Sequence, residues 1–99
     1  MKGLVQAHIR WLSKEEGGRS SVPLILHHVI VCRFESNAIT WPHEAWSLVV
    51  DFHTSPRTDK AVLADIRFLV SEGPSELLYS GSRFDLLDGY KVVAQGVVI

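Results

Sequence analysis

Short segments with β-strand patterns, separated by turn signals at intervals of about ten residues, constrain the fold of this chain more than any other feature. In residues 5–11, apolar side chains alternate with polar ones, and this period of two predicts a strand with one buried face. About six strands fit the chain, so the sequence predicts an all-β barrel or sandwich. The other clear candidate strands are residues 24–34, 45–52, 83–87 and 90–98.

The segment 60–70 fits two patterns. Every second residue from Val62 to Val70 is apolar, as on one face of a strand, but the apolar residues also match one face of a helix. Alanine, leucine and arginine are good helix formers, so intrinsic propensity does not decide between the two. Glu72-Gly73-Pro74 is expected to end the element in either case.

Two glycine-containing stretches indicate turns. Asp88-Gly89 lies between two apolar runs and is the strongest hairpin signal in the chain. Paired glycines permit positive φ, so Gly17-Gly18 predicts a turn or loop within residues 13–22. In the last run, small residues on one face are expected to let another strand pass closely. That face comprises Val92, Ala94, Gly96 and Val98.

Length and charge exclude several classes of protein. With 99 residues the chain is expected to form one domain, residues 1–99. A net charge of −1 argues against nucleic-acid binding by bulk electrostatics, and a single cysteine excludes an internal disulfide. No apolar run reaches the ~20 residues of a spanning helix, and no signal peptide is evident. We therefore expect no membrane association and a cytoplasmic location.

Two blocks of sequence resemble a known family. The L-S-K-E-E-G-G-R string of residues 12–19, followed by Pro23, is similar to the opening of the C-terminal β-barrel domain of translation elongation factor Tu. The G-S-R-F string of residues 81–84, then Asp88-Gly89 and the G-V-V of residues 96–98, is similar to the close of that domain. Together the blocks cover about a third of the chain. The middle of the chain, residues 24–60, does not match the family.

The resemblance implies a closed six-stranded antiparallel barrel, with residues 60–70 as a strand. It also implies a free-standing domain, because the chain lacks the G-x-x-x-x-G-K-[ST] phosphate loop of a GTPase. In the full factor this barrel binds the backbone of aminoacyl-tRNA, contacts the exchange factor and packs on the GTPase domain. Arg19 and Asp88-Gly89 fall on family positions that lie near tRNA phosphate.

These positions are the candidate binding residues: Gly17, Gly18, Arg19, Asp88 and Gly89. Backbone N–H groups of paired glycines, together with an arginine fork, suit an anion such as phosphate. The alternative is a solvated turn in which Arg19 pairs with a neighbouring glutamate.

Tryptophans supply the aromatic candidates. Trp41 and Trp46 flank a turn, and they are expected either to be exposed anchors for a partner or to cover the open end of the barrel. The alternation of residues 5–11 places Trp11 in the core. Cys32 lies in an apolar run and is expected to be a buried small hydrophobe.

Catalytic and metal sites are not expected. The five histidines lack metal-ligand spacing, and adjacent His27 and His28 point to opposite faces of a strand. The aspartates are scattered along the chain and are best explained as solvated or turn residues. Examples are Asp51, Asp65, Asp85 and Asp88. We therefore predict no catalytic residues, no metal and no cofactor.

These observations predict a non-catalytic binding module that engages a protein partner connected with translation. Binding to tRNA or another RNA is the alternative partner class, and it would require Arg10, Lys14, Arg19 and Arg33 to share one face. Two further alternatives are a small ligand-binding or enzymatic barrel with a pocket near Arg19, and a homodimeric scaffold that associates through a strand edge or the tryptophans.

Overall fold

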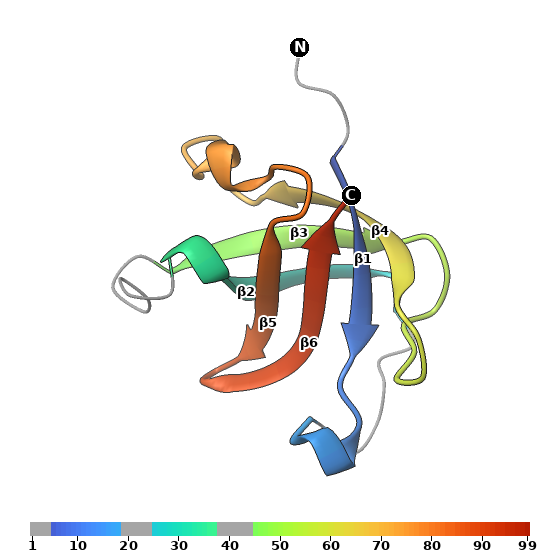
Figure 1. Cartoon of the computed structure of the whole chain (residues 1–99). Coiled ribbons are helices and arrows are strands. Elements are labelled where there is room, and N and C mark those ends of the chain that lie inside the picture. The colour runs from blue at the N-terminus through green and yellow to red at the C-terminus, as the bar shows by residue number, and fades with distance from the viewer. Residues whose placement is uncertain (1–4, 19–24, 38–44) are drawn as a thin grey trace.

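The computed structural model describes residues 5–18, 25–37 and 45–99. Its six strands form a closed antiparallel barrel in the order β1-β4-β3-β2-β5-β6, which confirms the predicted all-β barrel (Figure 1). Three short 3-10 turns complete the regular structure: η1 (Lys14–Glu16), η2 (Glu35–Asn37) and η3 (Ser75–Leu77). The strands are β1 (Val5–Trp11), β2 (His27–Phe34), β3 (Trp46–Phe52), β4 (Val62–Phe68), β5 (Arg83–Asp88) and β6 (Lys91–Val98).

The N-terminal strand closes the barrel, because β1 pairs on one side with β4 and on the other with β6. Ala7 lies opposite Ala64 of β4 and also opposite Val98 of β6. The ambiguous segment 60–70 is a strand because β4 is hydrogen-bonded between β1 and β3. It ends at Phe68, earlier than the Glu72-Gly73-Pro74 signal, and Leu69 and Val70 are exposed.

Apolar side chains fill the interior of the barrel, and aromatic rings pack at both of its ends. At one end Phe34 packs against Phe68 and Phe84, with ring centroids 5.9 and 5.2 Å apart. At the other end Trp11, which is buried as predicted, packs against Phe52 at 6.4 Å. Burial of this apolar surface is the main favourable contribution to folding.

The predicted β5–β6 hairpin is present, and Gly89 adopts the positive φ (63°) that its tight turn requires. A register shift between Leu86 and Leu87 of β5 changes which residues of β6 point inward beyond Ala94. Val93 is therefore buried where the alternation placed Val92. Gly96 lies opposite Phe84, and the phenyl ring fills the space that a side chain at Gly96 would need. At Gly96, the close approach is therefore made by the Phe84 ring of the core and not, as the sequence predicted, by the backbone of another strand.

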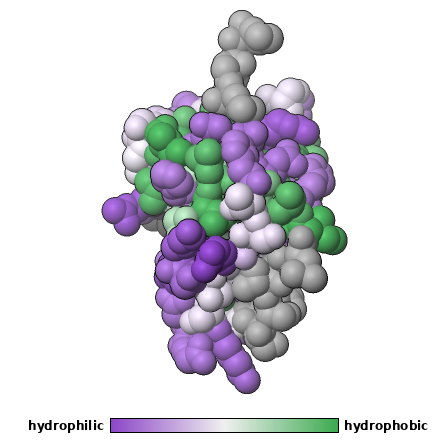
Figure 2. Space-filling view, turned by 90° about the vertical axis from the view of Figure 1, so that its right-hand side faces the viewer, coloured by the Kyte–Doolittle hydropathy of each residue, from purple (hydrophilic) through white to green (hydrophobic). Residues whose placement is uncertain are grey.

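No helix in the described ranges is long and apolar enough to cross a membrane. On the side of the barrel seen in Figure 2, polar side chains cover most of the surface and apolar ones are interspersed. On this side of the barrel, the surface is therefore mainly polar.

Candidate functional site

A row of polar side chains crosses four neighbouring strands on the outer face of the barrel. The register sets Arg33 of β2 opposite Asp85 of β5, Asp85 opposite Gln95 of β6, and Gln95 opposite Arg10 of β1. These residues point outward because the residues on either side of them in each strand face the core. The barrel thus aligns side chains that lie as far apart as residues 10 and 95.

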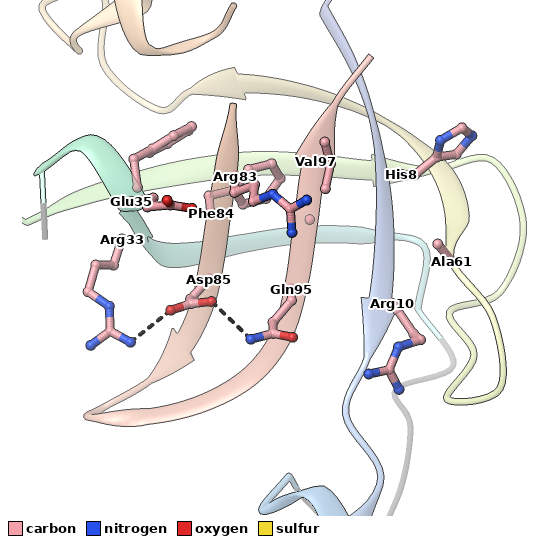
Figure 3. Close-up of a pocket in the computed structure, with 12 residues that line it drawn as sticks. His8, Arg10, Arg33, Glu35, Ala61, Arg83, Phe84, Asp85, Gln95 and Val97 are labelled. Atoms are coloured by element: carbon pink, nitrogen blue, oxygen red, sulfur yellow. Dashed lines mark hydrogen bonds and ion pairs between the residues drawn. The ribbon is translucent and has the colours of Figure 1, made fainter. Parts of the chain in front are cut away.

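Hydrogen bonds fix most of this row (Figure 3). Arg33 donates to Asp85 Oδ2 at 2.7 Å, and Gln95 Nε2 donates to Asp85 Oδ1 at 3.4 Å. Arg10 donates from both terminal nitrogens to the Glu16 carboxylate, each at 2.7 Å. It also donates to the carbonyl of Thr58 at 3.0 Å. Arg10 and Arg33 are therefore held in place by neighbouring carboxylates.

These residues line a groove of roughly 600 Å³, which we call the arginine groove. Arg83 of β5 lies opposite Val97 of β6, which in turn lies opposite His8 of β1. Figure 3 shows the Arg83 guanidinium directed from β5 toward β6. Arg83 is exposed, and its guanidinium makes no hydrogen bond or ion pair with any described residue. The lining residues are His8, Arg10, Arg33, Phe34, Glu35, Ala61, Arg83, Phe84, Asp85, Gln95, Gly96 and Val97.

The charge of the arginine groove is nearly balanced. Its three arginines face two lining carboxylates, Glu35 and Asp85, which leaves a formal charge of +1 with His8 neutral. Hydrogen bonds from Arg10 and from the Ser13 backbone lower the pKa of Glu16 to about 2. Glu16 therefore stays ionised and offsets the positive charge of Arg10 at every pH well above 2.

A second polar row on the outer face corrects one expectation from the sequence. Asp51 and Asp65, predicted to be scattered, lie directly opposite each other on β3 and β4. His27 bonds to Asp51 and His53 bonds to Asp65, the latter at 2.9 Å. The bond from His53, followed by one from Gln6, lowers the pKa of Asp65. In the parts of the chain that the structure describes, no three histidine, cysteine or acidic residues are grouped so that they could hold a metal ion.

The predicted glycine loops lie at one end of the barrel (Figure 1), and Gly17 directly follows Glu16, the ion-pair partner of Arg10. Gly17 ends η1 with a φ of 91°, and Gly18 packs against the backbone of Leu12. The Asp88-Gly89 turn joins β5 to β6 at the same end. Arg19 lies outside the described residues. None of the described candidates of these two loops lines the groove.

Trp46 is half-buried and packs against Phe68, with ring centroids 6.3 Å apart. Its carbonyl accepts a hydrogen bond from Cys32 Sγ at 3.3 Å. Cys32 is buried as predicted, and burial raises the pKa of its thiol to about 12, so the thiol remains protonated. Trp41, the other aromatic candidate, lies outside the described residues. The two adjacent histidines point to opposite faces as predicted: His27 bonds outward to Asp51, and His28 packs against Trp11 and Phe52.

Sequence reasoning anticipated only part of the arginine groove. Arg10 and Arg33 were named as members of a possible basic face, and both line the groove. Lys14 is exposed on η1 and does not line it. Arg83 belongs to the G-S-R-F string, which indicated the fold but not a binding residue. The available signal was its place directly before apolar Phe84 in the predicted strand 83–87, where alternation turns it to the outer face.

Comparison with protein-family models finds no match for this chain, and comparison with curated protein sequences finds none either.

Proposed function

We propose that this protein is a non-catalytic binding module, similar to the C-terminal barrel of elongation factor Tu, that engages a protein partner connected with translation. The binding face is the arginine groove on β1, β2, β5 and β6. The module acts in the cytoplasm, where its single thiol stays reduced.

The arginine groove is the observation that carries this proposal. The interior of the barrel is filled by side chains such as Phe34, Leu48 and Leu86, all nearly inaccessible to solvent. A partner must therefore bind outside the barrel, and the groove is a concave outer surface on which side chains from four strands converge. Arginine is enriched at protein interfaces because it combines charge, donors and apolar contact.

The relation to the elongation factor rests on two supports. The closed six-stranded antiparallel barrel is the fold that the sequence resemblance implies. The two loops that carry the resembling residues, around Gly17 and around Gly89, lie at one end of the barrel (Figure 1).

A protein is a better partner for this face than RNA. The chain carries a net charge of −1, and two of the groove's three arginines are bonded to carboxylates. An RNA backbone needs several cations that are free to neutralise phosphates.

Chemical cross-linking in cells, followed by affinity capture and mass spectrometry, tests the proposal. We expect wild type to capture a component of the translation machinery and Arg83→Glu to lose it. Arg67→Glu reverses an exposed charge on the outer face of β4, outside the groove, and should retain it. The proposal is wrong if both variants capture the same proteins as wild type, or if light scattering shows that Arg83→Glu only dissociates a homodimer.

Retention of tRNA on filters at low salt, lost steeply as salt rises, would instead favour the RNA alternative.

A further inference from the structure

Arg83 is the one arginine of the arginine groove that no described residue neutralises. Arg10 is bonded to Glu16 and Arg33 to Asp85, each at 2.7 Å. The acidic residue nearest to Arg83 along β5, Asp85, already accepts hydrogen bonds on both of its oxygens. Arg83 therefore presents a charged donor fork whose natural complement is a planar anion.

An exposed apolar side chain lies next to Arg83. Val97, its cross-strand partner on β6, is 38% exposed. A ligand that places an anion on Arg83 can therefore lay an apolar group against Val97.

The charges around Arg83 select against a chain of phosphates. Glu35 and Asp85 line the same groove as the guanidinium, so a polyanion would place its neighbouring charges near carboxylates. A polypeptide can carry one carboxylate between uncharged apolar residues, and it avoids this repulsion.

We propose that Arg83 binds a single glutamate or aspartate carboxylate of the protein partner, with an apolar neighbour of that residue packed on Val97. This inference rests on the proposed function and adds the chemistry that the partner must present. The carboxylate accepts N–H donors of the Arg83 guanidinium, while Arg10 and Arg33 keep their internal ion pairs.

Two short peptides test the inference: acetyl-Leu-Glu-Leu-amide and its neutral twin acetyl-Leu-Gln-Leu-amide. Each is titrated into the isotope-labelled full chain, and the amide signals of Gly96 and Val97 are followed by NMR. We expect the glutamate peptide to bind roughly fivefold more tightly than the glutamine peptide, the ratio that an exposed ion pair provides. Arg83→Gln should abolish this preference, and Arg67→Gln should retain it.

Equal binding of the two peptides to wild type, or a preference that survives in Arg83→Gln, would overturn the inference. So would a ten-nucleotide oligouridylate that shifts the same two amides at lower concentration than the glutamate peptide. The cross-linking experiment separates this outcome from failure of the proposed function. If Arg83→Glu loses the partner while the two peptides bind equally, the proposed binding function is supported, but the proposal that Arg83 binds a carboxylate is wrong. If Arg83→Glu keeps the partner, the proposed function itself fails.

Discussion

Two adjacent residues of β5 show how the inner and outer faces of the barrel differ. Phe84 points inward, is almost fully buried and packs against Phe34 with ring centroids 5.2 Å apart. Arg83 points outward, is exposed and makes no ion pair with any described residue. One strand thus places a side chain of the core directly beside an exposed charged side chain.

The same division holds along β6. Gly96 faces the Phe84 ring, while its neighbours Gln95 and Val97 are exposed on the outer face. Because side chains alternate across a strand wherever the register is regular, as it is around Phe84 and Gly96, a substitution can affect one face and leave the other unchanged. This comparison predicts that stability and binding can be separated residue by residue.

The largest expected effect is on the inner face. Phe84→Ala should lower the free energy of unfolding by about 3–5 kcal/mol, because it removes a buried ring and leaves a cavity between Phe34 and Gly96. Urea denaturation followed by tryptophan fluorescence measures this loss. Phe84→Leu keeps an apolar side chain in the site and should cost clearly less. A loss below 1 kcal/mol for Phe84→Ala would contradict the assigned role of the inner face.

The inner face is also the part of the fold that the sequence predicts best. Alternation over residues 5–11 identified β1 and the burial of Trp11, and Asp88-Gly89 identified the last hairpin. Residues 60–70 could not be assigned from local pattern, because β4 is specified by its pairing with β1 and β3. The register shift at Leu86/Leu87 left no local signal, so Val92 was placed where Val93 lies.

The candidate site was far less predictable. The arginine groove joins residues from four strands, and their alignment depends on the registers, which a period of two does not reveal. The same limit hid the pairing of Asp51 with Asp65, which are 14 positions apart in sequence and directly opposite in the barrel. Charged residues on outer faces have no periodic signal that separates a binding residue from a solvated one.

Gly96 tests the comparison on β6. Gly96→Val should lower the free energy of unfolding by about 1–3 kcal/mol, because its side chain would overlap the Phe84 ring. Gln95→Val, one residue away on the outer face, should change it by less than about 0.5 kcal/mol. Thermal melting followed by circular dichroism compares the two variants. Equal losses would show that the two faces are not independent at this position.

Asp85 lies on the outer face, where stability and binding are expected to respond in opposite directions. Asp85→Asn removes the carboxylate that pairs with Arg33, at a cost of about 0.5–1 kcal/mol because the pair is partly exposed. The same change raises the positive charge of the arginine groove, so the acetyl-Leu-Glu-Leu-amide peptide should bind more tightly. Chemical denaturation and the NMR titration measure the two effects. Weaker peptide binding would contradict the assigned electrostatics.

Glu16 makes the stability of the fold dependent on pH. The pKa of this carboxyl is about 2 in the fold against 4.5 as its ordinary value, so its contribution is complete above pH 4.5 and is lost as the pH falls toward 2. Glu16→Gln should therefore be less stable than wild type at pH 7, and the difference should shrink as the pH falls from 4.5 and vanish below pH 2. Urea midpoints measured across this range test the prediction, and a difference that stays constant with pH would contradict it.

The smallest expected change in stability is at Arg83, which gives the most stringent test of the difference between the inner and outer faces of β5. Arg83→Gln should alter the free energy of unfolding by less than about 0.5 kcal/mol, because the side chain is exposed and no described residue bonds to it. The same variant should lose the preference for the glutamate peptide. Urea denaturation and the peptide titration are measured on one sample, so that a binding loss cannot be attributed to unfolding. A loss of stability approaching that of Phe84→Ala would mean that Arg83 supports the fold, and the division between the two faces of β5 would then be wrong.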